Sequence, residues 1–265
     1  MMDSVIIGKY IPLDSLIHRM DPRSKLLLIF GYVIIIFLAN NLESYGLLIV
    51  YTVIVTLLTK VPYSYILKGL KPIIWIILFT FALHVLMTKE GDVLIQWGWF
   101  TIYEEGLRTG IFISIRFFLL VVMTSLLTLT TTPIEVTDGM ESLLHPFKRF
   151  GLPVHELALM MSISLRFIPT LMQETEKIMK AQTARGVEFT SGPITERLKA
   201  VIPLLVPLFI NSFRRAEELA NAMEARGYRG GEGRTKLREL KWKVSDSIFI
   251  MSLVMVTLIL VVIRL

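Results

Sequence analysis

Long apolar segments are the feature that most limits what this sequence can fold into. A helix needs about 20 residues to cross a bilayer. Five stretches are long and apolar enough: about Ser24–Asn40, Leu42–Leu58, Pro72–Met87, Leu107–Leu129 and Ser245–Leu265. The hydrophobic fraction of 54% agrees with this reading, because soluble domains hold roughly 45–50% apolar residues. We therefore expect an all-α integral membrane protein with about five transmembrane helices.

The basic residues outside these segments predict how the chain crosses the membrane. Cytoplasmic loops of membrane proteins carry an excess of Lys and Arg. Such residues precede the first segment and separate the second from the third, namely Lys9, Arg19, Arg23, Lys25, Lys60, Lys68 and Lys71. The loop 88–106 is mostly acidic, and the densest basic stretch is 133–243. We expect a multi-pass protein of the cell membrane with a cytoplasmic N-terminus and a C-terminus outside.

These assignments divide the chain into three parts. Residues 1–132 form an N-terminal membrane part with four spans, and apolar alternation around a glycine predicts a short outer hairpin near 90–103. Residues 133–242 form a cytoplasmic or interfacial region of long helices, inserted before the last transmembrane helix at 243–265. Pro203 and Pro207 interrupt an apolar stretch of this insert, so we expect the stretch to lie along the membrane rather than to span it.

The insert contains the tripeptide Ala-Arg-Gly twice. Each copy ends a helical stretch that changes from apolar to charged. The eleven residues EKIMKAQTARG and EELANAMEARG are identical at five positions. The copies are 41 residues apart (226 − 185) and comprise Ala184, Arg185, Gly186, Ala225, Arg226 and Gly227. Two copies in the same local context indicate a repeated surface element.

Each copy holds residue types that suit a helix end bound by another protein. Glycine adopts the left-handed conformation that ends a helix. Arginine can clamp a carboxylate with two hydrogen bonds, and alanine permits a close approach. We predict two docking tips for two similar partners. The alternative is that Arg-Gly is only a common helix ending with a solvated cation.

The sequence lacks the motifs of a motor or an enzyme. It contains neither G-x-x-x-x-G-K-[ST] nor G-x-S-x-G, so a P-loop ATPase and a serine hydrolase have no support. It has no cysteine, which excludes thiolate sites. No concentrated basic face with stacking aromatics indicates nucleic-acid binding. We expect a non-catalytic chain without a cofactor, a metal or a nucleic-acid partner.

Two other classes of protein stay open at this point. A self-sufficient ion-coupled carrier would need acidic residues within the membrane, whereas the interiors of the predicted spans hold Arg116 and His84 without Asp or Glu. We expect Arg116 to be a structural residue that extends toward the interface. A membrane enzyme would need a catalytic group, for which His18, Asp21 and His155 are the candidates.

Three motifs, taken in order along the chain, resemble signatures of one known family. They are HRMDPRSKLLL at 18–28, IYEEGLRTG at 102–110 and the doubled Ala-Arg-Gly. The first two resemble the entries to two spans of the transmembrane T component of energy-coupling factor (ECF) transporters, the EcfT/CbiQ-like family. The third resembles the paired signature on that family's coupling helices.

The resemblance implies an assembly. Two ABC-type ATPases would bind the coupling-helix tips and use ATP with Mg²⁺. A separate membrane protein, the S component, would capture a vitamin or a transition-metal ion such as cobalt or nickel. Arg185 and Arg226 would form salt bridges with acidic groups of the ATPases, while Ala184, Gly186, Ala225 and Gly227 shape the tips. The remaining partner is the lipid bilayer.

Overall fold

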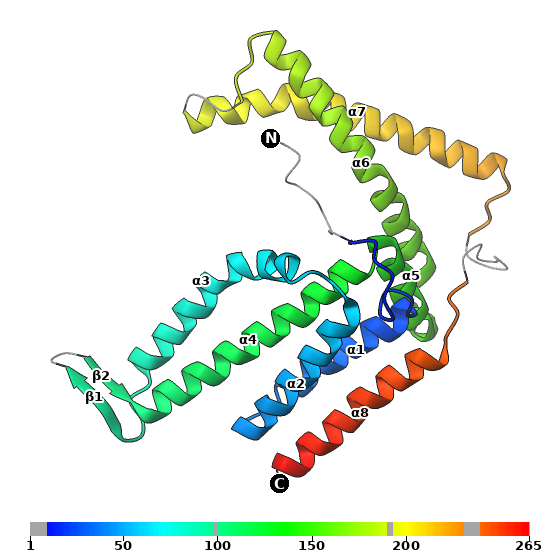
Figure 1. Cartoon of the computed structure of the whole chain (residues 1–265). Helices are drawn as coiled ribbons and strands as arrows, with labels where there is room; N and C mark the ends of the chain where they lie inside the picture. The colour runs from blue at the N-terminus through cyan, green and yellow to red at the C-terminus, as the bar shows by residue number, and fades with distance from the viewer. Residues whose placement is uncertain (1–9, 98–99, 190–192, 231–238, 265) are drawn as a thin grey trace. The chain divides into compact units, whose positions relative to one another are not determined.

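The structure, a computed structural model, describes residues 10–97, 100–189, 193–230 and 239–264. Helices predominate, and a single antiparallel hairpin is formed by β1 (Val93–Trp97) and β2 (Phe100–Tyr103) among these residues (Figure 1). The helices are α1 (Pro22–Ile36), α2 (Leu42–Thr59), α3 (Tyr63–Met87), α4 (Glu104–Thr130), α5 (Pro133–Leu144), the 3₁₀ turn η1 (His145–Phe150), α6 (Val154–Ala184), α7 (Ile194–Ala225) and α8 (Val244–Arg264). The all-α membrane class is confirmed.

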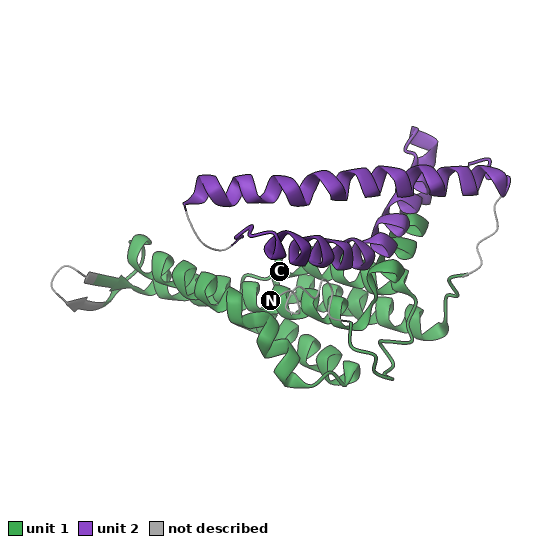
Figure 2. Cartoon of the chain, turned by 90° about the horizontal axis from the view of Figure 1, so that it is seen from above, with its two compact units in different colours: residues 1–143, 239–265 green, residues 144–238 purple. Residues whose placement is uncertain are grey.

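The chain forms two compact units (Figure 2). Unit 1 combines the residues up to 143 with those from 239 onward, and unit 2 covers 144–238. The sequence analysis set the first boundary at 132, before α5. In the structure α5 belongs to unit 1 up to Leu143, because Gly139 lies directly against α1. A Cβ atom on Gly139 would come within 3.0 Å of Leu26 Cδ1 and 3.2 Å of Pro22 Cβ.

Among the described residues, five helices are long and apolar enough to cross a membrane. Four of them, α2, α3, α4 and α8, correspond to predicted spans, and the fifth is α6 rather than α1. The first predicted segment forms a helix of only 15 residues, or about 22 Å. It ends early because the N–H groups of Phe37 and Leu38 donate to Ile34 and Ile35, which tightens the last turn.

Three prolines lie inside helices where the sequence predicted a helix start or an interruption. Pro72, expected to begin the third span, lies within α3, and Figure 1 shows this helix bending in its first half. Pro203 and Pro207 lie within α7, which continues through both. A proline removes one N–H and disturbs the preceding turn, so a long helix can kink and continue.

Helices α1, α2, α4 and α8 enclose the core of unit 1. Gly31 brings α8 close to α1, since a Cβ atom on Gly31 would lie 2.7 Å from Leu253 Cδ2. Trp75 and Met251 are among the large apolar side chains on the outside, as expected for helices that face lipid. The core side chains with the least exposure include Tyr32, Ile36, Tyr45, Leu48, Met123 and Leu260.

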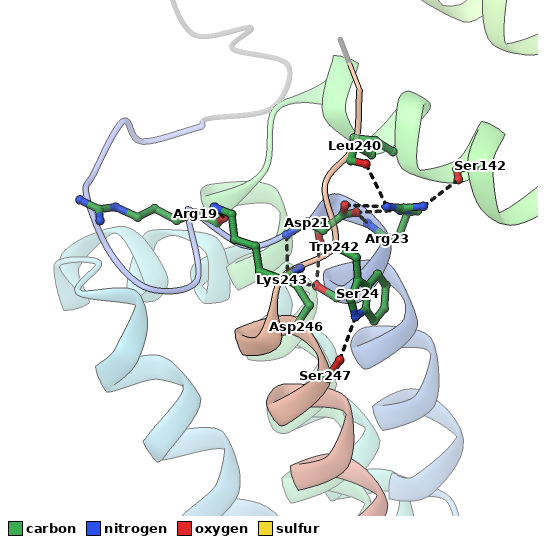
Figure 3. A network of polar contacts seen from close by, with 10 residues as sticks. All are labelled: Arg19, Asp21, Arg23, Ser24, Ser142, Leu240, Trp242, Lys243, Asp246 and Ser247. Carbon is green, nitrogen blue, oxygen red and sulfur yellow. Dashed lines mark hydrogen bonds and ion pairs between the residues drawn. The ribbon is translucent and has the colours of Figure 1, made fainter. Parts of the chain in front are cut away.

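A buried polar network joins the beginnings of α1 and α8 (Figure 3). Asp246 is 0% exposed, and its carboxylate accepts three hydrogen bonds. The donors are the Asp21 N–H at 2.9 Å, Ser24 Oγ at 2.8 Å and the Lys243 N–H at 2.7 Å. A buried carboxylate is tolerated only when such donors replace water. The network therefore attaches α8 to α1 although 225 residues separate Asp21 from Asp246.

Asp21 itself caps the N-terminus of α1. Its carboxylate accepts hydrogen bonds from the Arg23 N–H at 2.9 Å and from the Arg23 guanidinium at 3.0 and 2.9 Å. Burial alone would raise the pKa of Asp21, but these bonds outweigh it, so its pKa lies below the ordinary value. Arg23 also lies 5.7 Å from the centre of the Trp242 ring. The Asp-Pro-Arg segment is thus an anchor for the start of α8.

Arg116 has a structural role within unit 1. Its guanidinium donates to Tyr45 Oη at 2.9 Å and to the Ala39 carbonyl at 3.3 Å, and it lies 5.2 Å from the centre of the Phe37 ring. These contacts connect α4 to α2 through Tyr45 and to the turn between α1 and α2 through Ala39 and Phe37. The Arg116 side chain thus has hydrogen-bond partners within unit 1, and it does not depend on the membrane interface for them.

Replacing Asp246 with alanine should lower the free energy of unfolding by about 3 kcal/mol or more, because three donors lose their acceptor. Thermal unfolding of the purified chain in detergent measures this. Ser247→Ala is the control, since Ser247 is exposed and accepts one hydrogen bond from the Trp242 indole at 2.9 Å. Equal shifts in Tm for the two variants would contradict the role given to Asp246.

Candidate docking site on the paired helix ends

Helix α6 ends in a Schellman motif, in which two N–H groups beyond the helix donate to carbonyls of the last turn. The Gly186 N–H donates to Thr183 at 3.0 Å, and the Val187 N–H donates to Gln182 at 3.0 Å. The cap residue Arg185 has φ −88° and ψ 6°. The chain therefore leaves the helix immediately after the arginine.

Helix α7 ends in the same way. The Gly227 N–H donates to Glu224 at 2.8 Å, and the Tyr228 N–H donates to Met223 at 3.0 Å. The cap residue Arg226 has φ −86° and ψ 6°, within a few degrees of its counterpart in α6. The repeated sequence thus produces a repeated structure.

The two glycines are required by the backbone and not by packing. Gly186 has φ +88° and Gly227 has φ +77°, in the left-handed region that other residues enter at a cost of about 1 kcal/mol. A Cβ atom at either position would meet no described atom within 4 Å. The space beside each glycine is therefore open within unit 2.

The side chains at both ends are available to a partner. Ala184, Arg185, Ala225 and Arg226 are exposed. Among the residues that the structure describes, no ion pair includes either arginine. A cation is favoured at a helix C-terminus, and an unpaired guanidinium can bind a carboxylate with two hydrogen bonds. The six predicted residues therefore form two matching groups of three.

An ion pair joins α6 to α7 where the helices contact each other. The Arg215 guanidinium donates to the Glu174 carboxylate and lies 5.6 Å from the centre of the Phe167 ring. Both side chains are mostly buried, at 30% and 20% exposed. These two residues are 41 positions apart, the same offset as the repeat. Equivalent positions of the two helices therefore contact each other.

This contact places the two ends symmetrically along their helices. Eleven residues separate Glu174 from Arg185, and eleven separate Arg215 from Arg226. Both distances are about 16 Å at 1.5 Å per residue. A second equivalent pair, Leu171 and Ser212, lines a groove beside the same contact. The sequence analysis did not find the Glu174–Arg215 pair, although the offset of the repeat would have identified it.

Of the three candidate catalytic residues, the two in unit 1 have structural contacts. The His18 ring bonds to Ser15 Oγ at 2.6 Å and to the Ile11 carbonyl at 3.1 Å, while Asp21 caps α1. His155 belongs to α6 in the other unit. The described residues also contain no group of three side chains suited to hold a metal ion.

Comparison with known proteins identifies relatives along the whole chain. Residues 14–237 match the family described as "CbiQ: Cobalt transport protein". The energy-coupling factor transporter transmembrane protein EcfT of Bacillus subtilis (strain 168) is 65% identical over 264 residues, which cover 100% of both chains. The protein of the same name from Exiguobacterium sibiricum is 56% identical, over 98% of this chain and 99% of the relative.

The chain belongs to the CbiQ/EcfT family. A third relative, EcfT of Brevibacillus brevis, is 57% identical over 94% of each chain. The resemblance inferred from three motifs is thereby confirmed, and the chain is a multi-pass transmembrane component of an ECF transporter. Residues 14–237, which match the family, include both Ala-Arg-Gly helix ends of this chain.

Alanine at Gly186 or Gly227 should open the helix ends of this CbiQ/EcfT member, because the left-handed backbone is strained for alanine by about 1 kcal/mol. We expect the amides of Val187 and Tyr228 to exchange with D₂O several-fold faster in the respective variants. Gly46→Ala is the control, since Gly46 is exposed inside α2 and its added Cβ meets no atom within 4 Å. Unchanged exchange at both ends would contradict the assignment.

A double-mutant cycle on Glu174→Gln and Arg215→Gln should give a coupling free energy of about 1 kcal/mol or more, because this pair is mostly buried. The exposed pair Arg214–Glu218 is the matched control and should give about 0.3–0.5 kcal/mol. Chemical or thermal unfolding of the four chains in each cycle provides the values. A coupling no larger than that of the control would show that the contact between α6 and α7 does not depend on the pair.

Proposed function

We propose that this chain is the coupling subunit, or T component, of an ECF-type ABC importer. In this role it links two cytoplasmic ABC-type ATPases to a substrate-binding S component and transmits ATP-driven motion between them. The family membership supports this proposal. The observation that carries it is the pair of matched helix ends, each with an unpaired arginine in the described structure.

Each helix end suits one partner. Arg185 and Arg226 would bind carboxylates of the two ATPases, and Ala184 and Ala225 would allow the partner surface to approach the last turn. Gly186 and Gly227 end the helices, so the described chain does not continue along either helix axis. Because the two ends have the same backbone geometry, they would fit grooves of similar shape on the two ATPases.

The motor and the nucleotide would belong to the partners. The sequence contains no P-loop, so ATP and Mg²⁺ would be bound and used by the ATPases. The chain would be a non-catalytic subunit without a cofactor of its own. A self-sufficient ion-coupled carrier is not favoured, because the family match and the full-length relatives are transporter components of the ECF class.

The S component would bind an apolar surface and supply the cargo specificity. On α6 the side chains of Met160 and Met161 are 55% and 44% exposed. Methionine adapts its shape to different apolar partners, which suits a subunit that holds one or several S components. The cargo would be a vitamin or a transition-metal ion, captured outside this chain.

The proposal also includes an orientation in the cell membrane. The N-terminus and the region that holds both helix ends would be cytoplasmic, because Lys and Arg are concentrated there. The loop 88–106, which contains the hairpin of β1 and β2, and the C-terminus would be outside. This orientation places Arg185 and Arg226 on the side where ATP is available.

Charge reversal at both ends tests the function. The double variant Arg185→Glu, Arg226→Glu should insert into the membrane normally but lose co-purification with the ATPases, with affinity at least about tenfold weaker per end. Each single variant should retain one ATPase. The matched control is Lys177→Glu, Lys199→Glu, which makes the same charge change at exposed positions on α6 and α7.

Normal assembly and full transport by the Arg185→Glu, Arg226→Glu variant would refute the proposal. Uptake by the purified chain alone, in liposomes under an ion gradient, would instead support a self-sufficient carrier. The two experiments therefore separate the two classes of transporter.

A further inference from the structure

The second helix end differs from the first in what surrounds it. A cleft of about 640 Å³ lies between α6 and the end of α7, entirely within unit 2. Three arginines line it: Arg226 at the helix end, Arg229 just beyond it, and Arg166 on the facing side of α6. No Asp or Glu is among the described residues that line the cleft.

None of these three arginines has an ion pair among the residues that the structure describes. All three are exposed, so their charges are hydrated in the free chain. Three like charges around one cleft repel one another, and an anion that enters it lowers this repulsion while it gains charge-assisted hydrogen bonds. The cleft therefore favours a ligand with more than one negative charge.

The cleft also has an apolar wall. Leu159, Ile163 and Phe167 of α6 face Leu219 and Met223 of α7 across it. A simple inorganic anion would leave this wall in contact with water. A peptide segment that carries carboxylates beside an apolar side chain would cover the wall and reach the arginines at the same time.

The first helix end lacks these charges at the equivalent positions. Adding the offset of 41 to Arg166 gives Pro207 on α7, and subtracting it from Arg229 gives Glu188. Glu174 and Arg215, which differ by the same offset, contact each other, so the offset also relates the two helices where they meet. The two ends therefore share a backbone but present different charges to their partners.

We propose that Arg166 and Arg229 form a second anchor beside Arg226 and select the ATPase that binds the end of α7. The occupant of the cleft is an acidic segment of that ATPase, with an apolar side chain against α6 and carboxylates on the arginines. The end of α6 accepts the other ATPase, whose surface lacks this segment. This inference rests on the proposed function, since it takes the ATPases as the partners of both ends.

The experiment uses the full chain in nanodiscs and the two ABC ATPase subunits of the same transporter, each purified alone. Binding is measured for Arg166→Gln, Arg229→Gln and the double variant. Each substitution should weaken one ATPase about tenfold. That subunit should be the one that Arg226→Gln also weakens, while the subunit sensitive to Arg185→Gln keeps its affinity. Lys177→Gln and Lys199→Gln are controls for loss of exposed positive charge.

The outcomes are distinct. Loss of affinity for one ATPase alone, with a steeper salt dependence in the wild type than in the double variant, supports the proposal. The proposal is overturned if the variants bind both ATPases with equally lowered affinity. It is also overturned if Arg166→Gln and Arg229→Gln change neither affinity although Arg226→Gln has a clear effect. The proposed function stands in both cases. If the double variant loses retention of phosphatidylglycerol but binds both ATPases normally, the cleft is a lipid site and the proposal is wrong. If the wild-type chain binds neither ATPase, the proposed function fails as well.

Discussion

The carboxylate of Asp246 closes unit 1, and the rest of the structure depends on this closure. It accepts hydrogen bonds from Asp21 and Ser24 at the start of α1 and from Lys243 at the start of α8. A buried charge is stable only when its donors are in place. The start of α8 is therefore attached to the start of α1, although residues 144–238, which precede α8, form a separate unit.

Unit 2 uses the freedom that this closure provides. Its helices have few buried side chains within the described structure, and their contact includes the Glu174–Arg215 pair with the Phe167 ring beside it. The contact lies away from the C-terminal ends, and Arg185 and Arg226 at these ends are exposed. Two helices with so few buried side chains would not form a stable soluble domain alone, but such helices suit a chain whose helix ends are bound by partner proteins.

The sequence predicted those features that depend on local patterns. Apolar length located α2, α3, α4 and α8, and the doubled tripeptide located both helix ends, because a glycine after arginine ends a helix through nearby backbone bonds. It missed the early end of α1 and the continuity of α7 through Pro203 and Pro207, since neighbouring turns decide these. It also missed Asp246 and Glu174, whose partners are remote in the sequence.

The position of the Glu174–Arg215 contact has a mechanical consequence. Because the contact lies equally far from both ends, it acts as the fulcrum of two equal levers, each about 16 Å long. A change of the crossing angle carries Arg185 and Arg226 through arcs of the same length. Moving Glu174 by one helical turn, about 5.4 Å, would give the levers unequal lengths, and the same rotation would then displace one end further than the other.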